Sequence, residues 1–131
     1  MPTIGDVILD TSVVIPFFKG DVTLRASFVA SPTLYLPLTV LGELNCGANL
    51  SQNPSKHLAK IQNFLAAVVV LSPSITTAEH YGLIRAQLAQ AGTPIPENDI
   101  WIAAIAVEHQ LPLATRDIHF DRIVGLQVLK W

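Results

Sequence analysis

The sequence is poor in cysteine, in charge and in long apolar runs, and each shortage excludes a class of protein. The single cysteine, Cys46, has no partner for an internal disulfide, which predicts a reducing environment. Charged residues make up 14% of the chain and the net charge is −2, so there is no basic or acidic tail. No apolar run approaches the ~20 residues of a membrane span, and the N-terminus lacks the features of a signal peptide. We therefore expect a soluble, cytoplasmic protein.

Glycine-rich phosphate loops are absent as well. Neither GxGxxG nor GxxxxGK[ST] occurs in the sequence, which argues against the nucleotide-binding folds that depend on them. What the chain does have is a large apolar share: half of its 131 residues are hydrophobic. That is enough for one domain, residues 1–131, with its own core, and it favours an additional surface for self-association.

Short apolar runs alternate with segments of helical period. Four runs have the composition of strands, and a fifth is possible: Val7–Leu9, Leu34–Leu36, Val68–Leu71, Leu111–Thr115 and Gln127–Leu129. Because the runs are continuous rather than alternating, we expect strands that are covered on both faces. The helical period recurs in the segments 58–68, 81–88 and 100–107. The pattern predicts an α/β fold in three layers, a central parallel sheet of four to five strands flanked by helices.

Four acidic residues occupy unusual places in this pattern. Asp10 follows the first strand and Asp117 the fourth, at the carboxyl ends where open parallel sheets bind ligands. Glu43 lies in the apolar helical stretch "LTVLGELNCG", and Asp99 opens the most apolar helix. Each has an ordinary explanation alone, as a cap, a first-turn acid, a turn residue or an exposed helix position. Brought together they would repel one another, and they would suit a hard cation such as Mg²⁺ or Mn²⁺.

Two other phosphate chemistries also place acids at strand ends. A phosphoryl-accepting signalling domain needs a further acidic pair early in the chain and a lysine after a late strand. Here the first strand ends in "LDTS", and "LATRD" supplies Arg116 in place of lysine. A phosphatase of the haloacid-dehalogenase kind needs a second acid at position 12, which is Ser12. A phosphoryl-accepting signalling domain is an alternative function for this chain.

Several stretches resemble the PIN domain, and more narrowly the VapC toxins of prokaryotic VapBC toxin–antitoxin pairs. They are "VILDTSVVIPFF", "LTVLGELNCGA", "IPENDIWIAAIAVEHQLPLATRDIHFDRI" and "GLQV", and they follow the family order along almost the whole chain. The resemblance implies that the catalytic and metal-binding acids are Asp10, Glu43, Asp99 and Asp117. It also implies that Thr11 or Ser12 and Thr115 are the small hydroxyl residues near the metal, with Arg116 fitting the same pattern.

The resemblance implies a function too. PIN-domain toxins are Mg²⁺- or Mn²⁺-dependent ribonucleases in which a metal-activated water attacks an RNA phosphodiester and leaves a 5′-phosphate and a 3′-hydroxyl. A homodimer is implied, together with inhibition by a VapB-like antitoxin whose C-terminal segment enters the groove. A catalytically silent PIN-fold module that only binds protein is the second alternative.

The remaining residue types with chemical potential favour structural roles. His57, His80 and His109 have no zinc-ligand spacing. We expect His119 to shape the turn before Phe120 more than to approach the site. Cys46 lies in an apolar helix and is expected in the core rather than as a nucleophile.

The apolar context of Trp101 and Phe120 predicts core packing. Glu97 and Asn98 flank Asp99 and are expected to cap its helix. Phe17 and Phe18 are the candidates for an exposed apolar patch that binds the antitoxin or a second subunit.

Overall fold

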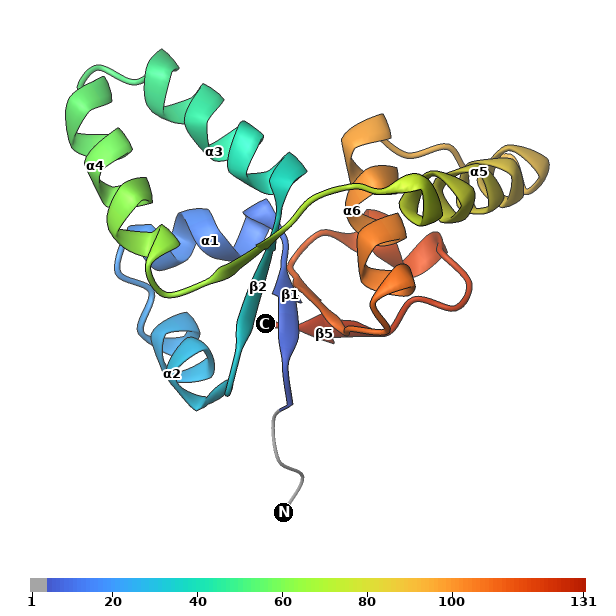
Figure 1. Ribbon diagram of the computed structural model, residues 1–131, viewed down its shortest axis with the longest axis horizontal. Coiled ribbons are helices and arrows are strands. Elements are labelled where there is room, and N and C mark those ends of the chain that lie inside the picture. Colours follow the sequence, from blue (N-terminus) through green and yellow to red (C-terminus); the bar gives the residue numbers. More distant parts are fainter. Residues whose placement is uncertain (1–4) are drawn as a thin grey trace.

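A five-stranded parallel sheet lies at the centre of the protein, in a computed structural model that describes residues 5–131 (Figure 1). The strands are β1 (Val7–Leu9), β2 (Leu34–Pro37), β3 (Val69–Leu71), β4 (Leu113–Thr115) and β5 (Val128–Lys130). Their order across the sheet is β3-β2-β1-β4-β5, and all neighbours are parallel. The predicted three-layer α/β fold is confirmed, and the fifth strand is present.

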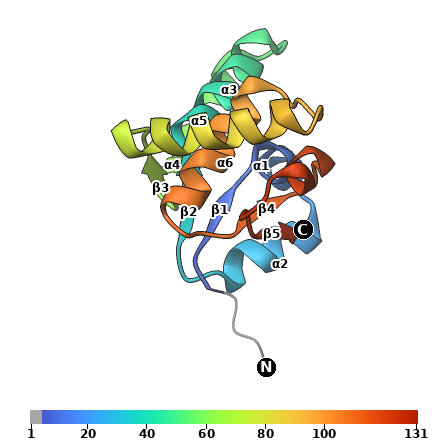
Figure 2. The ribbon, with the colours of Figure 1, turned by 90° about the vertical axis from the view of Figure 1, so that its right-hand side faces the viewer.

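Helices cover both faces of this sheet. They are α1 (Thr11–Phe18), α2 (Val22–Ala30), α3 (Leu38–Leu50), α4 (Pro54–Leu65), α5 (Ile75–Gln90) and α6 (Glu97–Glu108), followed by the short 3₁₀ helix η1 (Ile118–Arg122). In Figure 1, α1, α2 and α4 lie on one side and α5 and α6 on the other. Figure 2 shows α6 in front of the strands with α5 outside it. Among residues 5–131, no helix is long and apolar enough to cross a bilayer.

Local sequence explains where the helices begin and end. Asn53 caps α4 through its side chain, and Pro54 takes the first helical position, where its missing N–H costs nothing. Ser74 and Thr77 form a reciprocal capping box at the start of α5. That helix ends before Gly92, whose φ of 69° lies in the left-handed region that glycine adopts readily.

The core is centred on β1 and α6. All of β1 is fully buried, as are the residues of α6 from Ile102 to Ala106, so the prediction of a covered strand and a central apolar helix is confirmed. Phe120 is also fully buried, as predicted. Trp101 is only partly buried and stacks on Tyr81 with 4.1 Å between the ring centroids.

The prediction that Cys46 lies in the core is wrong, and Phe17 and Phe18 are less exposed than predicted. Cys46 is exposed, because the buried stripe of α3 runs through residues 40, 44 and 48 and leaves position 46 on the opposite side. Phe17 and Phe18 are partly buried against α2 and α4 rather than fully exposed, although Phe18 also lines a cavity beside α4. Phe17 stacks on Phe28 at 4.2 Å between centroids, and Phe18 meets Phe64 edge-on at 5.2 Å.

The sheet order places a topological switch point beside β1. The chain goes from β1 to β2 and β3 on one side, then returns to place β4 and β5 on the other. Ile8 is paired with Tyr35 of β2 and with Leu113 of β4. The direction of the strand order therefore reverses between β1 and β4, and the carboxyl ends of these two strands are where such sheets bind ligands.

Candidate active site

Asp10 lies at the carboxyl end of β1, where it also caps α1. Its side chain is 4% exposed, and its Oδ2 accepts hydrogen bonds from the Ser12 hydroxyl at 2.6 Å and the Thr115 hydroxyl at 2.8 Å. The backbone N–H of Ser12 lies 3.4 Å from the same oxygen. The capping role and a role in the site are therefore compatible, because one carboxylate sits at the end of a strand and the start of a helix.

Ser12 and Thr115 connect this carboxylate to the end of β4. The Thr115 hydroxyl accepts the backbone N–H of Asp117 at 3.0 Å, and the Ser12 hydroxyl accepts that of Arg116 at 2.9 Å. Thr115 is fully buried. Two of the predicted hydroxyl residues thus hold Asp10 and Asp117 in fixed relation across the two central strands.

Glu43 of α3 and Asp99 of α6 complete the acidic cluster. Burial raises the pKa of Glu43, and the charges of Asp10 and Asp99 raise it further. Burial likewise raises the pKa of Asp99, with added contributions from Asp10 and Asp117, while His119 acts in the opposite direction. The four predicted acids, from four separate segments, therefore lie near one another: Asp10 and Asp99 act on Glu43, and Asp10 and Asp117 act on Asp99.

Unsatisfied polar atoms in this cluster fit a bound cation. Among residues 5–131, the buried side-chain atoms without a well-directed hydrogen bond are Thr11 Oγ1, Glu43 Oε1 and His119 Nδ1. Thr11 is close enough to Glu43 to lower its pKa in part, although the pair lacks good hydrogen-bond geometry. A buried carboxylate oxygen without a donor, surrounded by other carboxylates, is the environment that a hard divalent ion stabilises.

His119, expected mainly to shape the turn before Phe120, also lies beside two of the acids. Its Nδ1 is 3.2 Å from Asp117 Oδ1 and 3.5 Å from Asp99 Oδ2. One ligating atom from each of these three residues lies within 4.8 Å of the others, a spacing that allows a shared metal ion. The signal in the sequence was the position of the histidine two residues after an acid at a strand end.

Other predicted positions differ from expectation. Pro96 precedes α6 and no side chain caps the helix, so the capping roles of Glu97 and Asn98 are wrong. Glu97 instead accepts a hydrogen bond from the Tyr81 hydroxyl at 2.6 Å. The Arg116 guanidinium pairs with Asp21 at 3.1 Å, and its place beside the substrate stays a prediction.

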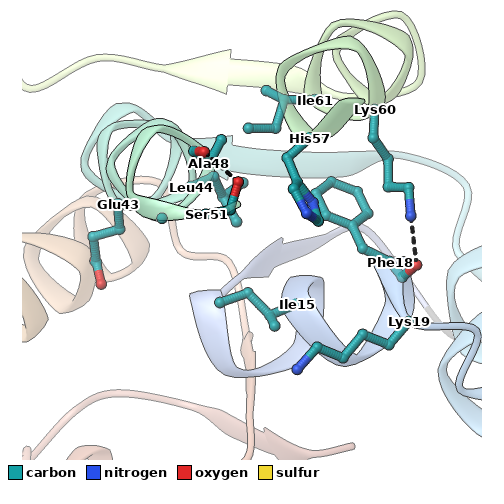
Figure 3. A pocket seen from close by; sticks show the side chains of 11 residues that line it. Ile15, Phe18, Lys19, Glu43, Leu44, Ala48, Ser51, His57, Lys60 and Ile61 are labelled. Atoms are coloured by element: carbon teal, nitrogen blue, oxygen red, sulfur yellow. Dashed lines mark hydrogen bonds between the residues drawn. The ribbon is translucent and has the colours of Figure 1, made fainter. Parts of the chain in front are cut away.

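A cavity of about 340 Å³ opens between α1, α3 and α4 beside the acidic cluster (Figure 3). Figure 3 shows Ile15, Phe18 and Ile61 around the hollow, with Glu43 at one end. Cationic or titratable side chains also line it: Lys19, His57 and Lys60. The Lys60 ammonium donates a hydrogen bond to the Phe18 carbonyl at 3.1 Å, which ties α4 to the end of α1. The cavity is therefore mainly apolar, with positive charge around it.

Comparison with known protein sequences identifies a family over most of the chain. Residues 7–126 match the PIN domain. The chain is 34% identical over 127 residues to "Ribonuclease VapC2" of Haemophilus influenzae, covering 94% of this chain and 96% of that protein. It is 33% identical over 126 residues to "tRNA(fMet)-specific endonuclease VapC" of Shigella flexneri, with the same two coverages.

Comparison with solved structures agrees. The fold is similar to a chain of DNA-bound VapBC from Salmonella typhimurium, with a TM-score of 0.90, 31% identity and 98% coverage of both chains. It is also similar to a chain of VapBC2 from Rickettsia felis bound to a promoter fragment, with a TM-score of 0.87 and 26% identity. That match covers 96% of this chain and 98% of the other.

Proposed function

Because this chain belongs to the PIN-domain family, we propose that it is an endoribonuclease and the toxin of a VapBC-type toxin–antitoxin pair. The observation that carries the proposal is the meeting of four acids from distant segments at the carboxyl ends of β1 and β4. They are accompanied by a buried carboxylate oxygen of Glu43 that has no protein donor. Relatives that match this chain along almost their full length carry the names of ribonucleases.

We assign the cation site to Asp10, Glu43, Asp99 and Asp117. A bound Mg²⁺ or Mn²⁺ would activate a water and neutralise charge on an RNA phosphodiester during in-line displacement, leaving a 5′-phosphate and a 3′-hydroxyl. Ser12 and Thr115 orient Asp10 through its Oδ2, and Thr115 also fixes the backbone of Asp117. This chemistry requires carboxylates that are held in fixed positions, because the ligands determine where charge is stabilised.

The alternatives are less well supported by the site. A phosphoryl-accepting signalling domain needs a further acidic pair early in the chain and a lysine after a late strand, whereas this chain has "LDTS" after β1 and Arg116 after β4. A silent binding module would have no need for four repelling carboxylates at one place. Both alternatives remain as outcomes of the test below.

We further propose that a VapB-like antitoxin inhibits the enzyme through the cavity shown in Figure 3. Its apolar lining suits an apolar side chain of the antitoxin's C-terminal segment, and Lys19 and Lys60 suit acidic groups beside it. Glu43 borders both the cavity and the acidic cluster, so a segment seated there would obstruct the substrate. A homodimer is proposed on the family resemblance, and exposed aliphatic residues such as Leu83 and Ile75 are compatible with one.

The test is cleavage of a total RNA pool by the purified protein in Mg²⁺, in Mn²⁺ and in EDTA. Asp99→Asn removes a ligand charge with little change in volume, so we expect it to abolish cleavage and keep the fold. Asp10→Ala should also abolish it, and Asp6→Asn, at an exposed position before β1, is the matched control that should cut normally. Normal cleavage by Asp99→Asn would refute the site assignment. Absence of cleavage by a folded wild-type protein in both metals would favour the binding-only alternative.

A further inference from the structure

We propose that His119 is a nitrogen ligand of the cation in this site and that it makes the site prefer Mn²⁺ to Mg²⁺. This inference rests on the proposed function for the presence of a cation, and it adds to the four acids a residue and a metal preference. It follows from the position of one imidazole nitrogen relative to two carboxylates.

The short turn after β4 places the imidazole over the acids. Asp117 Oδ1 accepts the backbone N–H of His119 at 2.9 Å, and this bond starts η1. The side chain of His119 therefore folds back, so that its Nδ1 lies 3.2 Å from Asp117 Oδ1 and 3.5 Å from Asp99 Oδ2. The next residue, Phe120, is fully buried and anchors the turn in the core.

These separations match ligands of one ion. In octahedral coordination with metal–ligand distances of about 2.1 Å, adjacent ligand atoms lie about 3 Å apart. The distances from Nδ1 to the two carboxylate oxygens are close to that value. One ligand atom from each of the three residues lies within 4.8 Å of the others, so a single cation could contact all three.

The hydrogen bonds within the protein do not account for Nδ1. The atom is buried from solvent and makes no hydrogen bond of good geometry, although His119 lies close enough to Asp99 to act against the rise in the pKa of that carboxyl. A protonated imidazole that acts only as an ion-pair partner is the competing explanation, and it would normally direct its N–H at one carboxylate oxygen. A metal ligand instead directs a lone pair at a point between the oxygens.

A nitrogen ligand changes which ion the site prefers. Imidazole suits first-row transition metals, whereas Mg²⁺ prefers a shell of oxygen atoms from carboxylates and water. Four carboxylates alone would bind either ion. With His119 among the ligands, Mn²⁺ gains an interaction that Mg²⁺ uses poorly.

The experiment measures metal binding directly, without RNA. Mn²⁺ is titrated into the metal-free protein, with the free ion followed by electron paramagnetic resonance, and Mg²⁺ affinity is measured by competition. Pulsed resonance spectra of the Mn²⁺-loaded protein report whether a ¹⁴N nucleus is directly coordinated. We expect that signal in the wild type and its loss in His119→Asn. Mn²⁺ affinity of the variant should fall at least roughly tenfold and Mg²⁺ affinity much less.

The control is His109→Asn, the same substitution at an exposed histidine that also lies near a carboxylate, 3.7 Å from Glu108. It should retain the ¹⁴N signal and both affinities. Absence of the signal in the wild type, or an equal loss of Mn²⁺ and Mg²⁺ affinity in His119→Asn, would overturn the proposal in favour of an ion pair. Mn²⁺ binding with ¹⁴N coordination but no RNA cleavage would refute the proposed function and support the ligand assignment. RNA cleavage without a ¹⁴N signal would support the proposed function and refute the assignment of His119 as a ligand.

Discussion

The two oxygens of Asp10 have different surroundings. The hydrogen bonds recorded for its carboxylate, from Ser12 and Thr115, all end on Oδ2. Among residues 5–131, no donor is found for Oδ1. One oxygen therefore orients the side chain and the other is available to a ligand, which is the division expected of a metal-binding carboxylate with supporting residues.

Thr115→Val tests this support with a side chain of nearly the same shape. The substitution removes the donor to Asp10 and the acceptor for the Asp117 N–H in a fully buried place. We expect the free energy of unfolding to fall by about 1–3 kcal/mol, because a buried backbone donor is left unsatisfied. RNA cleavage should fall as well, since Asp10 and Asp117 lose their common anchor. Chemical denaturation and cleavage rates measure the two effects.

Thr115→Ser is the matched control, because it keeps the hydroxyl and loses only a methyl group. It should retain most of the cleavage rate even if it loses some stability to a small cavity. Equal losses of cleavage in the valine and serine variants would show that packing, not the hydroxyl, is what the site needs from this position.

The sequence was informative about the acids and uninformative about their neighbours, for a physical reason. Asp10 and Asp117 could be placed together because parallel strands end at one edge of a sheet, which needs no knowledge of side-chain conformation. His119 depends on how the first turn of η1 directs its ring, and Arg116 on the position of Asp21 at the start of α2. Such contacts follow from tertiary packing and have no periodic signature.

At the scale of elements, α3 separates the acidic cluster from the apolar cavity. Its residues Leu44 and Ala48 face the core and border the cavity, and Glu43 reaches the acids. Gly47 also lines the cavity, and a Cβ built on it would meet no atom within 4 Å. A side chain at position 47 would therefore begin in open space at the edge of the cavity.

Gly47→Leu uses that room to test the antitoxin proposal. The fold should be kept or slightly stabilised, because glycine inside a helix costs about 0.5–1 kcal/mol relative to alanine. Binding of a VapB-type antitoxin should weaken by tenfold or more, since the leucine would occupy the space proposed for the antitoxin side chain. Affinity measured by titration, together with the melting temperature, separates blocked binding from unfolding.

Gly82→Leu is the control, at a helical glycine of α5 that also has nothing within 4 Å of its Cβ. It should bind the antitoxin as the wild type does. Undiminished binding by folded Gly47→Leu would place the antitoxin outside this cavity.

The positions of the elements could be predicted, while their ends depended on hydrogen bonds that the apolar pattern does not reveal. The predicted fourth strand began at Leu111, but β4 begins at Leu113. The N–H of Leu111 is used at the end of α6, where it donates to the Ala106 carbonyl at 3.0 Å, and Pro112 has no N–H to give. Similarly, the helical period continued to Val68, whereas α4 ends at Leu65 and a turn follows.

At the scale of the whole molecule, the acidic cluster couples stability to pH. The pKa values of Glu43 and Asp99 are raised above the ordinary 4.5 and 3.8, so the folded protein retains these protons at a pH where the unfolded chain has lost them. In metal-free protein the free energy of unfolding should therefore rise as the pH falls from neutrality through the raised values. Asp21 and Glu108 have lowered pKa values, so the stability they contribute is lost only at still lower pH.

A divalent cation should reverse this trend, because it binds the ionised carboxylates and stabilises the folded state by mass action. We expect saturating Mn²⁺ to raise the melting temperature most at high pH and least at low pH, where protons compete for the ligands. Unfolding curves in EDTA and in Mn²⁺, from about pH 5 to about pH 8, measure both slopes.

In the double variant Glu43→Gln/Asp99→Asn, the metal-free protein should be more stable than the wild type at high pH and should lose most of its pH dependence. A wild-type slope of the opposite sign in EDTA, or one unchanged in the double variant, would mean that these two acids do not carry unrelieved repulsion. Either result would also contradict the proposal that a cation holds the cluster together.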